Sequence, residues 1–228
     1  MTFYNMPITM IDLARSTDLF RGLSAEEVEG VLYRLNGVKK TFAKGETVVH
    51  AGLEAKRMFA VASGRLRVYE QTSEVHSVFV REIAEGEVLG LWIAHMPDVM
   101  CWPGTVVAVE PCTLLSLDIA AARRMMGTSG PAVARIGVNA SKMLSRELFT
   151  TWRKLMVMDA PTIETRIRVY LSELDNETGR TGSVTVPFDR ERMAEYFGVT
   201  RPALSRTLGQ MRDRGLLTWR KSVFKINF

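Results

Sequence analysis

The stretch from Asp189 to Leu217 constrains the fold of this chain more than any other, because it carries the start and stop signals of two short helices. Asp189 is a favourable N-cap for the first helix, and Thr200 is one for the second. Gly198 follows the first helix, where a sharp end favours a residue tolerant of positive φ. The pattern predicts two helices joined by a tight turn, a helix-turn-helix.

The second predicted helix has one buried stripe and polar side chains on its other faces. Leu204, Leu208 and Met211 are spaced four and three residues apart, as on a buried helical face. Arginine and hydroxyl side chains remain near the N-terminus of the helix, where a recognition helix contacts base edges in the major groove. We therefore predict DNA binding. The alternative is a helical hairpin with a solvated basic face.

A short hairpin is predicted after the two helices, with its turn at Lys221-Ser222, and it has the position of a wing. Residues 187–228 contain nine Lys and Arg against four Asp and Glu, an excess equal to the net charge of +5 of the whole chain. The positive charge is thus concentrated where a phosphate backbone would lie.

Length and composition narrow the remaining possibilities. A chain of 228 residues with 46% apolar residues can form two domains with real cores. No apolar run reaches the length of a membrane span and no signal pattern begins the chain, so we expect a cytoplasmic protein without a membrane partner. Cys101 and Cys112 are too few for a disulfide framework. A redox pair of these two cysteines stays open.

The middle of the chain changes from helical to β period. Residues 18–35 predict a helix with a capping box at Ser24 and Glu27, whereas residues 1–17 carry little signal. Residues 38–118 contain short β-rich segments separated by glycine turns, which predicts a small β-barrel or jelly roll.

A long helix is predicted from about Ala132 until Ala160-Pro161 interrupts it. Six of its positions, spaced three and four apart, form a heptad seam that implies a partner helix, such as the same helix of a second subunit. The alternative is one flank of a single-chain core. The seam residues are Ser141, Leu144, Leu148, Thr151, Leu155 and Met158.

The predicted fold class is therefore α+β. A β-roll or jelly-roll effector-sensing domain occupies residues 1–128, a long dimerisation helix and hinge residues 129–158, and a winged helix-turn-helix DNA-binding domain residues 159–228.

This order of elements resembles the Crp/Fnr family of bacterial transcription regulators. The matching words lie in residues 42–48, 59–69 and 86–90 of the β-rich part and in residues 193–201 and 204–206 of the helix-turn-helix. The resemblance implies a homodimer that binds a partly palindromic operator, contacts RNA polymerase and responds to a small effector held between β-roll and long helix.

Within the resemblance, Arg206 and Ser205 match the base-contacting pair of the family, and Arg201 matches a residue that contacts base or phosphate. Arginine suits guanine because its guanidinium meets O6 and N7 together. Pro202 stands where the family commonly has a glutamate, so the usual family operator is not expected. The candidate contacts to the phosphate backbone are Thr200, Arg190 and Arg192.

The effector implied by the resemblance is not a cyclic nucleotide. Members that bind cyclic AMP carry a glutamate after the glycine that matches Gly90, and an arginine-serine or arginine-alanine pair a turn later. Here Leu91-Trp92 follow Gly90, and residues 94–105 contain neither Arg nor Lys. A buried phosphate without a cation is unfavourable. Since no cysteine precedes Cys101, an iron–sulfur cluster of the family type is not expected either.

Soft and aromatic side chains follow Gly90 instead, and they suit an apolar ligand or haem, whose axial ligands can be His, Cys or Met. The alternatives are that His95 is a loop histidine and that the methionines fill the core. The candidate effector pocket consists of Leu89, Trp92, His95, Met96, Met100, Cys101 and Trp102.

The function predicted from the sequence is a homodimeric, sequence-specific transcription regulator controlled by a small effector. One alternative is a nucleoid-type DNA-binding protein whose β-roll is an unoccupied scaffold, and another is a haem-based gas or redox sensor. An enzyme is not expected, because no nucleophile–base set or metal-ligand spacing occurs and the three histidines are scattered.

Overall fold

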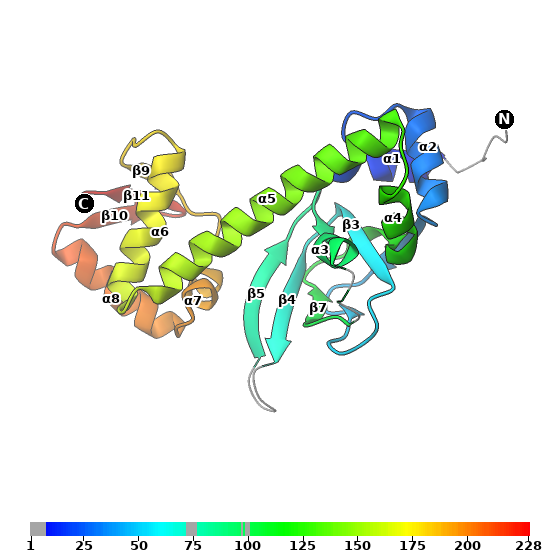
Figure 1. Cartoon of the computed structure of the whole chain (residues 1–228). Coiled ribbons are helices and arrows are strands. Elements are labelled where there is room, and N and C mark those ends of the chain that lie inside the picture. The colour runs from blue at the N-terminus through cyan, green and yellow to red at the C-terminus, as the bar shows by residue number, and fades with distance from the viewer. Residues whose placement is uncertain (1–7, 72–76, 97, 99–100) are drawn as a thin grey trace. The chain divides into compact units, whose positions relative to one another are not determined.

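The computed structural model describes residues 8–71, 77–96, 98 and 101–228, and the chain divides into two compact units (Figure 1). The first unit is Met1–Glu147 and the second is Leu148–Phe228. The boundary falls inside helix α5 (Pro131–Asp159), so this helix contributes to both units. Each unit contains its own cluster of buried apolar side chains, as expected of a domain.

The first unit contains two four-stranded antiparallel sheets. Strand β3 has a continuous run of buried residues rather than an alternating one, because both of its faces are covered. The two sheets confirm the predicted small β fold. One sheet has the order β1 (Val38–Phe42), β8 (Cys112–Asp118), β3 (Arg57–Ser63) and β6 (Val88–Leu89); the other has β2 (Thr47–Val49), β7 (Thr105–Ala108), β4 (Leu66–Gln71) and β5 (Ser77–Ile83).

Helices gather at the start of α5 in the first unit, where Figure 1 shows α1, α2 and α4 around its first turns. The capping box is confirmed, since the Glu27 N–H donates to Ser24 Oγ at 3.2 Å and the Ser24 N–H donates to Glu27 Oε2 at 2.8 Å. The helices are α1 (Ile8–Arg15), the 3₁₀ turn η1 (Asp18–Phe20), α2 (Ala25–Arg34), α3 (Leu91–His95) and α4 (Ile119–Met126).

Three details of the first unit differ from the sequence predictions. The single helix predicted over residues 18–35 is wrong at its start, because Gly22 has φ +80° and separates η1 from α2. Helix α1 lies in the stretch that carried little signal. Helix α3, of five residues, is too short for a periodic pattern to show.

The second unit confirms the winged helix-turn-helix. Asp189 caps α7 by accepting from the Arg192 N–H at 2.9 Å, Thr200 caps α8 by accepting from the Ala203 N–H at 3.4 Å, and Gly198 has φ +64°. The elements are α6 (Ile163–Glu177), β9 (Ser183–Thr185), α7 (Arg190–Phe197), α8 (Arg201–Asp213), β10 (Leu217–Arg220) and β11 (Val223–Ile226), with the strand order β10-β11-β9.

None of the helices in the described part of the chain is both long and apolar enough to cross a membrane.

Candidate functional site

The helix-turn-helix is held by an apolar core and by one arginine clamp. Leu204, Leu208 and Met211 on α8 are buried against the apolar side of α7. Arg166 on α6 donates to the Phe197 carbonyl at 2.9 Å and to the Ala160 carbonyl at 3.0 Å. Because Phe197 ends α7, this clamp fixes the end of the first helix next to the turn that precedes the second.

The predicted base contacts lie together on the exposed face of α8. Arg201, Ser205 and Arg206 are exposed near the N-terminus of this helix. Arg201 pairs with Glu191 at 3.5 Å, but both side chains are more than 60% exposed, and such surface pairs contribute little. The described residues give the Arg206 guanidinium no ion pair or hydrogen bond, so it is available for an external acceptor.

Two of the candidate phosphate contacts have structural roles, and only that of Thr200 was indicated by the sequence. The Arg190 guanidinium lies over the rings of Trp219, at 5.2 Å, and Phe224, at 4.8 Å, and ties α7 to the wing. Burial lowers the pKa of Arg190. The hydroxyl of Thr200 is engaged in capping α8, while Arg192 is half-buried in the first turn of α7.

The wing adds a second group of cations. Arg220, Lys221 and Lys225 are exposed on and beside the hairpin, and no acidic side chain within the described ranges pairs with them. Lys221 adopts φ +56° in the turn of the hairpin. Arg206 and these side chains are exposed cations of the second unit, and their positive field attracts polyanions.

The residues predicted for the effector pocket are distributed over two cavities of the first unit. Leu89, Trp92 and Trp102 line a pocket of about 110 Å³, here called the β-roll pocket, with Arg81, Gly90 and Glu147. His95 lines a cavity of about 380 Å³, here called the junction pocket, with Met58, Leu91, Met125, Met126 and Gly137. Met96 and Cys101 are exposed and line neither pocket, and Met100 lies outside the described residues.

The β-roll pocket contains a cation that the sequence analysis missed. Arg81 reaches it from β5 and forms ion pairs with Glu147 of α5 at 2.6 Å and with Glu87 at 3.3 Å. Burial raises the pKa of Glu147, and the charge of Arg81 opposes that shift. With two carboxylates on one guanidinium and Glu70 also in the lining, the pocket offers no surplus positive charge to a phosphate.

An indole ring occupies much of the space beside Gly90. Trp102 is only 5% exposed, and a Cβ added at Gly90 would lie 2.5 Å from its ring. Gly90 therefore allows the indole to approach the backbone at the start of α3, and it does so with φ +80°. The small volume of the β-roll pocket follows from this packing.

Neither cysteine chemistry nor a metal site is apparent in the part of the chain that the structure covers. Cys101 is exposed, Cys112 is buried, and neither forms a disulfide. The Cys112 thiol donates to the carbonyls of Glu110, at 3.1 Å, and Arg65, at 3.3 Å, and burial raises its pKa. No group of three or more His, Cys, Asp or Glu among the described residues could hold a metal ion.

The junction pocket suits an uncharged ligand better than haem. His95 could supply one axial ligand, and methionine sulfurs lie in the same lining. However, the described lining contains no Lys or Arg to pair with the two haem propionates.

Comparisons with known proteins match both units. The model of the cyclic nucleotide-binding domain matches residues 39–129, and that of the Crp-like helix-turn-helix domain matches residues 165–227. Electron transport regulator A of Shewanella oneidensis is 22% identical over 78% of this chain and 70% of its own length. The transcriptional activator protein FnrA of Stutzerimonas stutzeri is 22% identical over 76% of this chain and 70% of its own length.

Solved structures agree on the fold. The c-di-GMP responsive global regulator CLP of Xanthomonas campestris has a TM-score of 0.66 at 19% identity and covers 90% of this chain and 100% of its own. A CooA mutant from Carboxydothermus hydrogenoformans has a TM-score of 0.66 at 19% identity, covering 86% of this chain and 85% of its own. At this identity the likeness shows the fold alone.

Proposed function

This chain belongs to the Crp/Fnr family of transcription regulators, and we propose that it acts as a homodimer that binds a specific DNA sequence under the control of a small effector other than a cyclic nucleotide. The family consists of DNA-binding regulators rather than enzymes. The observation that carries the proposal is the exposed face of α8, on which Arg201, Ser205 and Arg206 lie together.

In the proposed complex α8 enters the major groove. Arg206 donates to O6 and N7 of a guanine, with Ser205 and Arg201 contacting the neighbouring bases or phosphates. Thr200 and Arg192 are the candidate backbone contacts on the helix-turn-helix. Arg190 would contact phosphate only through the edge of its guanidinium that Trp219 and Phe224 leave open, so its main proposed role is to hold the wing.

An exposed apolar strip on α5 supports the dimer. Leu148 is 72% exposed and Leu155 is 65% exposed, and Phe149 and Trp152 stack on the same helix with ring centroids 6.0 Å apart. Contiguous apolar surface of this kind marks an interaction site in water. The proposed interface is the heptad seam, in which Ser141, Leu144, Thr151 and Met158 complete the positions.

The β-roll pocket supports the exclusion of a cyclic nucleotide. Its one arginine is already paired with two carboxylates, and the ring of Trp102 occupies the space beside Gly90. The effector is proposed to shift an equilibrium between two arrangements of the dimer. RNA polymerase is the proposed protein partner and the cytoplasm the proposed location, both on the ground of the family.

The experiment that tests DNA binding is selection of duplexes from a random pool by the full-length protein. We expect enrichment of a two-fold symmetric sequence with half-sites about 34–36 Å apart along the DNA. The Arg206→Ala variant should select a pool in which one base pair per half-site is no longer fixed. A pool without enrichment would contradict sequence-specific binding and favour the nucleoid-type alternative.

The dimer is tested separately by sedimentation of the Leu148→Glu and Leu155→Glu variants. Both side chains are exposed, so the fold of the single chain should survive the change. We expect monomers and a loss of operator affinity, while Thr218→Glu, an exposed change on the wing strand, should leave the dimer intact. A wild-type protein that sediments as a monomer at micromolar concentration would refute the homodimer.

A further inference from the structure

The proposed DNA contacts leave the junction pocket of the first unit without a role. Its lining comes from η1, the end of α2, β3, α3, α4, the α4–α5 connection and the first turns of α5, and none of these lining residues belongs to the β-roll pocket. Leu19, Met58 and Leu91 on its walls are buried, and its volume of about 380 Å³ lies in the range of small-molecule sites. His95, Met126 and Gly137 on its rim are exposed, so the pocket opens to solvent and a small molecule can enter it.

Small residues on α5 keep the cavity open. Ala134, Gly137 and Ala140 of the helix line it, as does Gly130 just before the helix begins. Gly137 lies inside the helix, where glycine is about 1 kcal/mol less favourable than alanine. A Cβ added at Gly137 would meet no heavy atom within 4 Å, so no packing contact requires the glycine there. The glycine thus leaves open space on this wall of the pocket.

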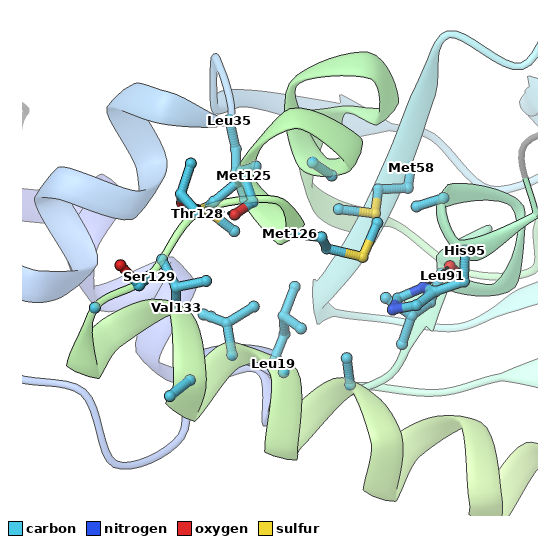
Figure 2. Close-up of a pocket in the computed structure, with 17 residues that line it drawn as sticks. Leu19, Leu35, Met58, Leu91, His95, Met125, Met126, Thr128, Ser129 and Val133 are labelled. Carbon is cyan, nitrogen blue, oxygen red and sulfur yellow. Dashed lines mark hydrogen bonds between the residues drawn. The ribbon is translucent and has the colours of Figure 1, made fainter.

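His95 is a polar side chain with a defined hydrogen-bonding state in this mostly apolar lining. His95 Nδ1 is 2.9 Å from the Leu91 carbonyl oxygen, which can only accept, so we assign the proton to Nδ1. In the neutral imidazole Nε2 is then an acceptor, and no residue in the described ranges donates to it. Figure 2 shows His95 at the end of the cavity opposite Ser129 and Val133.

The position of His95 is fixed by its surroundings. Arg123 on α4 donates to the carbonyls of Ile93 and Met96, each at 2.9 Å, and so holds the end of α3. At the far end of the cavity, the Thr128 hydroxyl accepts from Arg34 at 2.7 Å and donates to the Met125 carbonyl at 2.7 Å. The Thr128 hydroxyl is therefore engaged within the protein, whereas no residue in the described ranges donates to His95 Nε2.

We propose that the junction pocket binds an uncharged, largely apolar small molecule that carries one hydroxyl group, and that this hydroxyl donates to His95 Nε2. The ring or chain of the molecule fills the space beside Gly137 and Ala140, in contact with the first turns of α5. This proposal rests on the proposed function in one respect, which is that the bound molecule acts as the effector of the regulator.

The probe for this proposal is 1-naphthol, with naphthalene as the partner that lacks the hydroxyl. Calorimetric titration of the full-length protein should give one 1-naphthol site per chain. The His95→Phe variant, which keeps a ring but lacks Nε2, should bind 1-naphthol about three- to tenfold more weakly and naphthalene unchanged, as expected for one lost hydrogen bond. Equal weakening of both probes would overturn the role of Nε2.

Filling the cavity tests its location. Gly137→Leu should weaken both probes at least about tenfold, because the new side chain occupies the space that the ring needs. Gly30→Leu is the matched control, since Gly30 also lies inside a helix of the first unit with nothing within 4 Å of an added Cβ, but does not line the pocket. If Gly137→Leu does not fold, Ala134→Leu on the same wall replaces it.

The remaining outcomes are also decisive. Unchanged binding to the filled variants would place the probe elsewhere and overturn the proposal. A Soret absorption band in the purified protein that disappears in His95→Phe would show haem in place of an uncharged ligand and would overturn it as well. DNA selection with the same variants tests the proposed function separately from the pocket assignment. Probe binding without DNA enrichment would refute the proposed function and leave the pocket assignment standing.

Discussion

The two units of this protein use the same residue type in opposite ways. In the β-roll, arginines on and beside the strands are neutralised by carboxylates: Arg65 pairs with Glu110 at 2.9 Å, Arg67 with Glu82 at 3.3 Å, and Arg81 with Glu87 and Glu147. In the second unit Arg206 and the cations of the wing have no acidic partner among the described residues. The net charge of +5 therefore acts almost entirely through the second unit.

This difference separates structural charge from charge that is available to a ligand. A paired and partly buried guanidinium stabilises its own fold and gives a phosphate little gain, whereas an exposed and unpaired one retains its field. We therefore expect substitutions of Arg206 and of the wing cations to change DNA affinity. Substitutions of arginines in the first unit should change stability instead.

The largest expected effect concerns the core that supports the exposed face of α8. Leu204 is fully buried, and Leu204→Ala should destabilise the second unit by roughly 2–5 kcal/mol, measured by denaturant unfolding. DNA binding should be lost with it. Gln210→Ala, an exposed change on the same helix, should stay within about 0.5 kcal/mol of the wild-type stability. Equal effects of the two changes would mean that α8 does not pack as described.

The next effect is on recognition itself. Arg206→Ala should weaken binding to the selected operator by about 1–3 kcal/mol and relax specificity at one base pair of each half-site. Lys225→Ala on the wing should weaken all duplexes alike and reduce the salt dependence of binding by about one counterion. Competition titrations with single-base operator variants distinguish the two patterns. A uniform loss in Arg206→Ala would make Arg206 a phosphate contact.

Alanine substitutions at two glycines should change the free energy of unfolding in opposite directions. Gly137→Ala should stabilise the chain by about 1 kcal/mol, because alanine favours the helix and its Cβ meets nothing. Gly198→Ala should destabilise the second unit by about 1–2 kcal/mol, because φ is +64° and the new Cβ would lie 3.0 Å from Met158 Cε. Thermal unfolding of both variants measures the contrast. A stabilising Gly198→Ala would show that the turn adopts another conformation.

The smallest effect is a pH dependence in the β-roll pocket. The pKa of Glu147 is raised chiefly by burial, so the folded state binds this proton more tightly than the unfolded state. The stability that Glu147 contributes is therefore present below the ordinary glutamate pKa of about 4.3. It is lost as pH rises through the raised pKa of the folded state. Glu147→Gln should flatten the stability profile over that range in unfolding titrations from pH 4 to pH 7. An unchanged slope of stability against pH would show that the charge of Arg81 fully offsets the effect of burial on the pKa of Glu147.

The two units also differ in how well the sequence predicts them. The ends of α7 and α8 depend on neighbouring residues, so Asp189, Gly198 and Thr200 identified them correctly. The β-roll pocket is assembled from residues far apart in the chain. No local pattern could bring Arg81 of β5 to Glu147 of α5, and the absence of basic residues in 94–105 did not reveal that the pocket contains an arginine.

The separation of His95 from Trp92 has a similar cause. The sequence placed both in one candidate pocket, whereas the turn of α3 places Trp92 in the lining of the β-roll pocket and His95 in that of the junction pocket. The stacking of Arg190 on the wing was equally hidden, because Trp219 and Phe224 come from strands that follow α8. Exposure of Arg206, by contrast, followed directly from the helical spacing of Leu204 and Leu208.

The most direct test of the central claim is the ratio of affinities for the selected operator and a scrambled duplex, measured from 50 to 200 mM salt. If α8 recognises base edges while the wing cations contact phosphate, both affinities should fall with salt and the ratio should remain at about 10³ or above. A ratio near one at every salt concentration would contradict recognition of base edges by α8, because the exposed cations of the second unit would then bind DNA by charge alone.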